Sequence, residues 1–139
     1  MGAAVYDGSR PLKDATVQEI QLELIRRSLF GGIKGERILA CLLEHRELWE
    51  AVLMDRLCPY RAGALPPTLM KLRDLPSGRW NADRLLILTS DKEVGRKLAA
   101  ICEEKMPGGM VHVYADPEVV DHALGQGRCG KAIISIWWD

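Results

Sequence analysis

Apolar residues recur at helical spacing through the first third of the chain. Thr16 begins a capping box, and apolar positions then return every three or four residues as far as Ile25. A second, longer stretch with the same spacing runs from residue 35 to residue 57, and the glycine pair at 31–32 separates the two stretches. This pattern predicts two helices joined as a helical hairpin over residues 15–57.

The second half of the chain alternates between continuous apolar runs and amphipathic stretches. The apolar runs lie at residues 84–89, 110–115 and 132–138, and a capped amphipathic stretch separates each run from the next. The order strand, helix, strand, helix, strand is typical of a parallel sheet with right-handed crossovers. We therefore expect a β-α-β-α-β unit with helices on both faces of its sheet.

The character of each run suggests its place in that sheet. The first and third runs are apolar nearly throughout, as in strands buried on both faces, whereas His112 and Tyr114 give the second run one polar face. The expected strand order is therefore second, first, third (2-1-3). This order leaves the third strand at an edge of the sheet.

Prolines and glycines interrupt the stretch between the two halves, which is typical of a connector, although Pro67 permits one short helix there. The prediction is a single α/β domain of 139 residues. Its parts are a lead-in at 1–14, a helical hairpin at 15–57, a connector at 58–82 and a βαβαβ unit at 83–139.

The composition is that of an ordinary globular protein without a charge bias. The 19 Lys and Arg residues balance the 19 Asp and Glu residues, which does not favour a general nucleic-acid or membrane-surface binder. No apolar run approaches the roughly 18 residues that a membrane span needs. The start of the chain also lacks the pattern of a secretory signal. We expect a cytoplasmic protein.

The four cysteines form no CxxC pair, which favours buried free thiols in a reducing compartment. Cys41 and His45 are four residues apart on a predicted helix, a spacing that can hold zinc. No second ligand pair accompanies them, so a half-buried histidine is the preferred interpretation. The sequence predicts no metal, no cofactor and no catalytic residue.

Polar residues follow the ends of the three predicted strands. In an open α/β sheet, ligands bind outside the carboxyl ends of the strands, and carboxylates there can hold Mg²⁺. The alternative is structural, with helix caps, a first-turn acid and the chain end at these positions. The candidate ligand-binding residues are Ser90, Asp91, Asp116 and Asp139.

The connector carries cations and aromatic side chains. Residues 56–84 contain six Lys and Arg residues against two Asp residues. Such a stretch can track a nucleic-acid backbone, with help from the glycine turn before residue 35. The alternative, favoured by the neutral overall charge, is a solvated loop with anchoring aromatics. The candidate nucleic-acid contacts are Lys34, Arg37, Arg73, Arg79 and Trp80.

The third predicted strand ends in two tryptophans, which point to opposite faces of a sheet. An apolar strand at a sheet edge invites pairing with another chain, and a two-fold partner would cover it. We therefore expect a homodimer. The residues expected in or beside its interface are Ile134, Ile136, Trp137 and Trp138.

These observations favour a non-catalytic interaction or regulatory protein that self-associates. The reason is that no nucleophile–base pair, metal set or phosphate loop stands in the right context. Two alternatives remain. One is an enzyme or domain that binds a small ligand, Mg²⁺ or a nucleotide at the carboxyl edge of the sheet. The other is a weak nucleic-acid binder that uses the connector at 56–84. A protein partner is compatible with the first hypothesis, and no membrane contact is expected.

Overall fold

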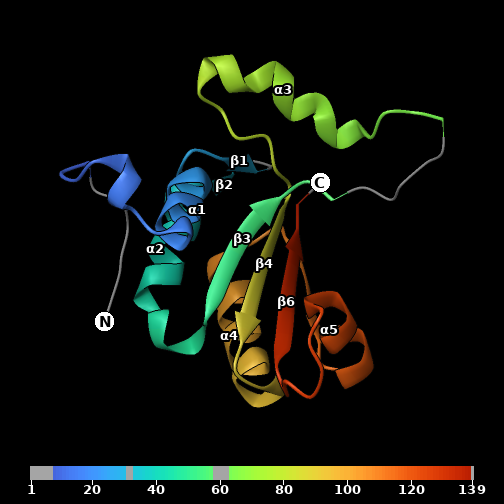
Figure 1. Cartoon of the computed structure of the whole chain (residues 1–139). Coiled ribbons are helices and arrows are strands. Elements are labelled where there is room, and N and C mark those ends of the chain that lie inside the picture. The colour runs from blue at the N-terminus through green and yellow to red at the C-terminus, as the bar shows by residue number, and fades with distance from the viewer. Residues whose placement is uncertain (1–7, 31–32, 58–62, 139) are drawn as a thin grey trace.

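The computed structural model shows a four-stranded antiparallel sheet flanked by helices (Figure 1). It describes residues 8–30, 33–57 and 63–138. The strand order is β3–β4–β6–β5, and each strand runs antiparallel to its neighbours. The strands are β3 (Ala51–Asp55), β4 (Arg84–Thr89), β5 (Met110–Tyr114) and β6 (Ala132–Trp137), and β1 (Leu29–Phe30) pairs with β2 (Ile33–Lys34) in a second, two-stranded sheet.

Helices cover the two faces of the large sheet unequally. α2 and α4 pack on the face that carries the hydrophobic core, α5 packs on the other face, and α1 lies beside β3. In the described residues, no helix combines the length and the apolar character that a membrane crossing requires. The helices are α1 (Val17–Arg26), α2 (Gly35–Glu44), α3 (Lys71–Asp74), α4 (Lys92–Lys105) and α5 (Pro117–Leu124), and the 3₁₀ turns are η1 (Leu12–Asp14), η2 (Arg46–Leu48), η3 (Pro67–Met70) and η4 (Leu75–Ser77).

The predicted parallel sheet with strand order 2-1-3 is wrong. β6 lies between β4 and β5 and runs antiparallel to both of them. The physical reason is burial: Ile134 and Ile136 of β6 are fully buried, and a central position gives both edges of this strand a partner. The polar β5 lies at an edge, but its neighbour is β6 and not β4.

The helix predicted for residues 35–57 is wrong in its second part. α2 ends at Glu44, and β3 follows it. In β3, Val52 and Met54 are buried while Leu53 is exposed, which is the two-residue period of a strand. Pairing with β4 along the whole length of β3 outweighs the helical spacing of the sequence.

α1 and α2 pack on each other, and β1 and β2 connect them. The predicted turn at 31–32 lies outside the described residues. The two helices approach most closely at Gly35, whose backbone N–H donates to the Ser28 carbonyl oxygen at 2.9 Å. A Cβ atom at Gly35 would lie 1.9 Å from the carbonyl oxygen of Ile25, so this contact between the helices requires glycine.

Side chains of α1 close the outer edge of β3. The Gln18 amide donates from Nε2 to the Val52 carbonyl oxygen at 2.8 Å, and its Oε1 accepts from the Val52 N–H at 2.9 Å. Gln21 accepts from the Met54 N–H at 3.4 Å. Residues three apart share a helix face, so both amides reach the same strand edge. The Gln18 amide supplies the donor and the acceptor that a further strand would supply.

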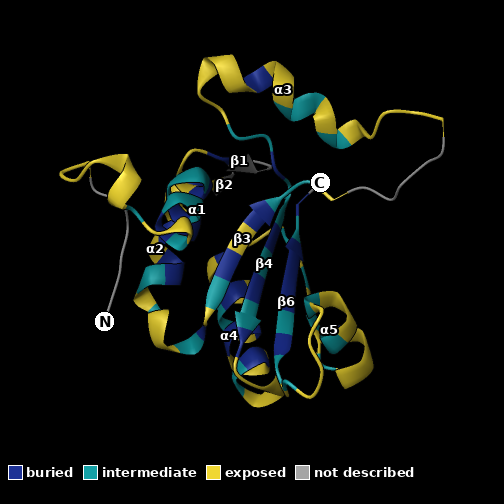
Figure 2. Cartoon of the chain, in the orientation of Figure 1, coloured by how far each residue is buried: buried dark blue, intermediate teal, exposed yellow. Residues whose placement is uncertain are grey.

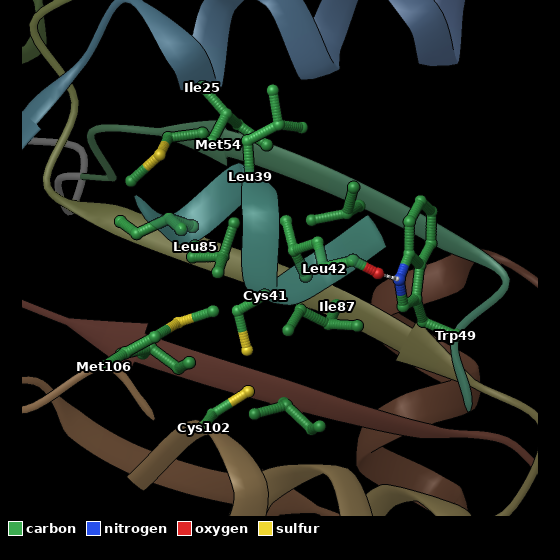
Figure 3. Packing of buried hydrophobic residues seen from close by; sticks show 14 of the residues in the cluster. Ile25, Leu39, Cys41, Leu42, Trp49, Met54, Leu85, Ile87, Cys102 and Met106 are labelled. Atoms are coloured by element: carbon green, nitrogen blue, oxygen red, sulfur yellow. Dashed lines mark hydrogen bonds between the residues drawn. The ribbon is translucent and has the colours of Figure 1, made fainter. Parts of the chain in front are cut away.

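The core lies between the sheet and the pair α2 and α4 (Figure 3). Trp49 is buried and donates its indole N–H to the Leu42 carbonyl oxygen at 2.7 Å. Cys41 of α2 and Cys102 of α4 are buried free thiols, as expected, and their sulfur atoms face each other. The hydrogen bond with Cys41, together with burial, raises the pKa of the Cys102 thiol. The same hydrogen bond lowers the pKa of the Cys41 thiol. Both thiols are buried and form part of the core packing.

We predict that Gln18→Leu destabilises the fold, because leucine leaves the N–H and C=O groups of Val52 without a partner. Val52 is buried, and an unsatisfied buried polar group costs on the order of 1–3 kcal/mol. Chemical denaturation followed by tryptophan fluorescence measures the free energy of unfolding. Gln126→Leu, at an exposed loop position, is the matched control and should change nothing. Equal stability of the two variants would contradict a structural role for this edge closure.

Candidate functional site

The face of the sheet opposite the core carries apolar side chains in register. Residues that alternate with the core residues of β3, β4 and β6 point to this face. Leu53 lies opposite Leu86, and Leu88 lies opposite Ile133. Leu53 is 42% exposed even though its neighbours Val52 and Met54 are buried. Another layer of structure normally covers an apolar sheet face of this kind.

α1 and α5 form the two walls of a groove over this face. Figure 1 shows the two helices on either side of β3, β4 and β6, and Figure 2 shows partly exposed residues between them. The groove has a volume of about 670 Å³. We call it the open-face groove. Its floor includes Leu53, Leu86, Leu88 and Ile133, and its walls include Val17, Gln18 and Gln21 of α1 and Val119, Ala123 and Leu124 of α5.

Local interactions hold α5 in the position of a wall. The side chain of Val120 in α5 is fully buried. Gly125 caps the end of the helix in a left-handed conformation, with φ of 65°. Asp121 fixes the loop that follows by accepting from the N–H of Arg128 at 2.9 Å and from the Cys129 thiol at 2.8 Å. The Cys129 thiol and the backbone N–H donors hold the pKa of Asp121 below its usual value. The loop at 125–130 is therefore a structural connection to β6.

The groove offers little acid–base chemistry. Among the described residues that line it, Arg84 and Tyr114 are the ionisable ones, and no His, Asp, Glu, Cys or Lys is present. The Arg84 Nε atom is buried and has no hydrogen-bond partner in the described part of the chain. Asp55 lies opposite Arg84 in the sheet, but its carboxylate accepts from Lys71. The groove is thus an apolar surface with one cation at the end formed by Arg84.

The candidate ligand-binding residues divide between two ends of the sheet. Asp91 caps α4 by accepting from the Val94 N–H at 2.9 Å, and Asp116 caps α5 by accepting from the Glu118 N–H at 3.0 Å. Ser90, which is exposed, lies at the same end as these two. β6 runs in the opposite direction, so the chain leaves it at the other end of the sheet. Asp139 lies outside the described residues.

The ligand hypothesis requires the carboxyl ends of the three strands to lie at one edge of the sheet. They do not, because β6 runs antiparallel to β4 and β5. β4 and β5 are also separated by β6, which places Asp91 and Asp116 roughly two strand spacings, about 10 Å, apart. Within the described residues, no group of three or more His, Cys, Asp or Glu side chains can hold a metal ion. His45, the other residue of the possible zinc pair with Cys41, directly follows the last residue of α2 and is half-buried.

The candidate nucleic-acid contacts lie on two separate elements. Lys34 and Arg37 are exposed at the start of α2. Arg79 is exposed beyond η4, and Arg73 pairs with Asp74 at 3.0 Å. Their nucleic-acid role stays a prediction.

Trp80 is held in place by the protein itself. Its indole N–H donates to the Met54 carbonyl oxygen at 3.1 Å, and the Lys71 ammonium lies over its ring at 4.9 Å from the centroid. One face of the ring is therefore occupied, which leaves less of it for stacking on a base.

The candidate interface residues are mostly internal. Ile134, Ile136 and Trp138 are buried within the monomer, and Trp137 is half-buried. The predicted interface requires β6 to be an edge strand. β6 is central, so both of its edges are already paired and these residues serve the fold of the monomer.

Sequence reasoning did not find the open-face groove. One part of its signal is visible in the sequence, because the apolar runs of β4 and β6 have aliphatic residues on both faces. Such a pattern predicts a sheet with both faces covered. The decisive information is that α1 lies at the edge of the sheet, and this placement depends on contacts between distant residues.

Comparisons with protein-family models, with curated proteins and with solved structures find no match for this chain.

We predict that Asp91→Ala and Asp116→Ala each lower the free energy of unfolding by about 1 kcal/mol, as the loss of a helix N-cap should. Thermal unfolding with and without Mg²⁺ checks this account, and Mg²⁺ should not change the melting temperature of the unmodified protein. A stabilisation by Mg²⁺ that disappears in Asp91→Ala would instead support the ligand hypothesis at the strand ends.

Proposed function

We propose that this chain is a non-catalytic interaction protein that binds an amphipathic helix of a protein partner in the open-face groove. The observation that carries the proposal is the apolar face of β3, β4 and β6 between two helical walls, which no other part of the described chain covers. A groove of this kind can receive the apolar side of a helix, with leucine-type anchors at helical spacing. Exposed apolar patches on soluble domains commonly mark such interaction sites.

The chemistry of the groove supports binding rather than catalysis. A general acid–base mechanism needs a group that exchanges a proton near the working pH, such as His, Asp or Glu. The described lining residues provide none of these. Catalysis by a nucleophile also needs an adjacent base, and the hydroxyls of Ser135 and Tyr114 have no such base among the lining residues.

Charge on the walls favours a basic partner helix. α5 and its cap carry Asp116, Glu118 and Asp121, and the helix contains no Lys or Arg. The α1 wall presents the neutral amides of Gln18 and Gln21. A partner with cations beside its apolar stripe would therefore meet an acidic rim, which steers association and sets orientation.

We also propose that the protein works in a reducing compartment such as the cytoplasm. The support is that Cys41 and Cys102 lie against each other as thiols in the core. A compartment that favours disulfides would oxidise adjacent thiols that become accessible during folding.

We predict that a fluorescently labelled synthetic helix with leucines at positions i, i+3, i+4 and i+7 and lysines elsewhere binds the protein saturably. Fluorescence anisotropy measures the binding. The variant Leu53→Gln/Val119→Gln should weaken it at least tenfold, because each burial of a large aliphatic side chain contributes roughly 1.5–3 kcal/mol. Both residues are exposed, at 42% and 48%, so the fold should tolerate glutamine there.

Two controls make this test specific to the groove. Leu12→Gln changes a leucine that is 59% exposed and lies outside the groove, and it should leave the binding unchanged. A helix with glutamates in place of the lysines should bind more weakly, because it meets the acidic α5 wall. Equal binding by the groove variant and the Leu12→Gln control would rule out the open-face groove as the site.

One observation favours a second candidate, an amphipathic carboxylate such as a fatty acid. The volume of about 670 Å³ lies within the roughly 300–1,000 Å³ of small-molecule sites. Arg84 stands at one end of the groove, and its Nε has no hydrogen-bond partner among the described residues. An aliphatic tail on the floor and a carboxylate on Arg84 would satisfy both features.

For this second candidate, we predict that dodecanoate binds and that Arg84→Gln weakens it about tenfold or more, because a hydrogen bond to a charged group contributes about 1.5–3 kcal/mol. Isothermal titration calorimetry measures both affinities. Dodecanol, which has the same tail and no charge, is the control and should bind the two proteins equally. An equal loss of affinity for the acid and the alcohol would show that Arg84 does not recognise the carboxylate.

A further inference from the structure

The exposed apolar surface of the protein falls into two parts. In the described residues, eleven large hydrophobic side chains are exposed, and five of them line the open-face groove. Four others share one short segment after residue 62. We call these four the leucine stripe. They are Leu65, Leu69, Leu72 and Leu75, with exposures of 81%, 40%, 63% and 50%.

The leucine stripe has the geometry of one face of a helix. η3, α3 and η4 follow one another without a break from residue 67 to residue 77. Leu69, Leu72 and Leu75 lie within this run and are spaced by three residues, which places them on one side of it. Leu65 precedes the run by two residues. Figure 2 shows this segment beyond the end of the sheet with most of its residues exposed.

Polar contacts fix the opposite side of the segment to the protein. Lys71 pairs with Asp55 of β3, and Asp74 is buried and accepts from the Asn81 amide at 2.7 Å. Trp80, just after the segment, donates to the backbone of β3. These contacts fix the segment beyond the end of the sheet, and Leu75 lines a small pocket together with Leu24 of α1. The other three leucines of the stripe remain exposed in the monomer.

The stripe and the groove complement each other in shape and in charge. The groove fits a helix with leucine-type anchors, and the segment presents three leucines at that spacing, with Leu65 just before it. Lys71 is held on the other side of the segment by Asp55, so the cations beside the stripe are Arg73, which is exposed and pairs with its neighbour Asp74, and Arg79, which follows the segment. These two arginines would meet the acidic residues of α5.

We propose that the leucine stripe of one copy lies in the open-face groove of a second copy, and that the contact is reciprocal around a two-fold axis. This inference rests on the proposed function and names the partner helix. One short helix in a groove is a small contact, whereas a stable interface buries about 1,600 Å² in total. Reciprocity provides two such contacts per dimer, and it closes the assembly.

The test uses light scattering on the full chain and two variants. The groove variant is Leu53→Gln/Val119→Gln, and the stripe variant is Leu69→Gln/Leu72→Gln. We expect twice the chain mass for the unmodified protein at micromolar concentration. Each variant alone should be monomeric, because neither of the two contacts can form. Leu12→Gln should remain dimeric.

Mixing the two variants gives the decisive measurement. The stripe of the groove variant is intact, and so is the groove of the stripe variant, so one contact can form between them. The mixture should therefore contain a heterodimer that neither variant forms with itself, and that dissociates at a higher concentration than the unmodified dimer. Distinct fluorescent labels on the two variants detect it by energy transfer.

Other outcomes overturn the inference. A monomeric unmodified protein, a dimer that survives in both variants, or a mixture without energy transfer would each exclude the proposed contact. Thermal unfolding checks that the variants are folded, and Leu65→Gln/Leu75→Gln serves as a second stripe variant if the first is not. If the unmodified protein is monomeric but still binds the leucine–lysine helix, the proposed function stands and only its partner is wrong.

Discussion

The hydrogen bonds between the Gln18 amide and the backbone of Val52 are the interaction on which the rest of the architecture depends. They place α1 beside the sheet, at the edge of β3, and not across one of its faces. An edge strand with free N–H and C=O groups can pair with a strand of another chain. The Gln18 amide occupies these groups of Val52 and so blocks such pairing there. With α1 in this place, no helix of the described residues crosses the face of β3, β4 and β6 between α1 and α5, and α1 becomes one wall of the open-face groove.

The two faces of the sheet therefore differ in how far helices cover them. α2 and α4 bury one face in a core that includes Leu85, Ile87 and Ile134. Among the described residues, α5 is the one helix that packs on the other face, anchored by Val120. Leaving aliphatic side chains in water forfeits about 25 cal/mol for each Å² of apolar surface that could have been buried. In this fold, hydrogen bonds close the edge of the sheet while one sheet face stays open. The exposed apolar surface of the sheet is therefore concentrated on that face, where a partner can cover it.

Local signals in the sequence predicted the local structure. The capping box at Thr16 and the cap at Asp116 begin helices as expected, because each cap depends on residues two or three positions away. The helix after β4 begins one residue later than predicted, with Asp91 and not Ser90 as its cap. The order and direction of the strands could not be predicted in this way. The place of β6 between β4 and β5, and the extended conformation of Val52 in β3, depend on partners far away along the chain. The groove was missed for the same reason, since its walls are brought together by these long-range contacts.

The presence of a groove and a matching stripe on one chain has a consequence for any other partner. In the proposed dimer each apolar surface covers the other, so a foreign helix competes with the stripe of the second copy. By mass action, its apparent affinity falls as the concentration of the protein rises above the dimer dissociation constant. The leucines and the groove residues are then exposed together only in the monomer. Self-association would thus protect both surfaces from unspecific contacts and set the concentration range in which another protein can bind.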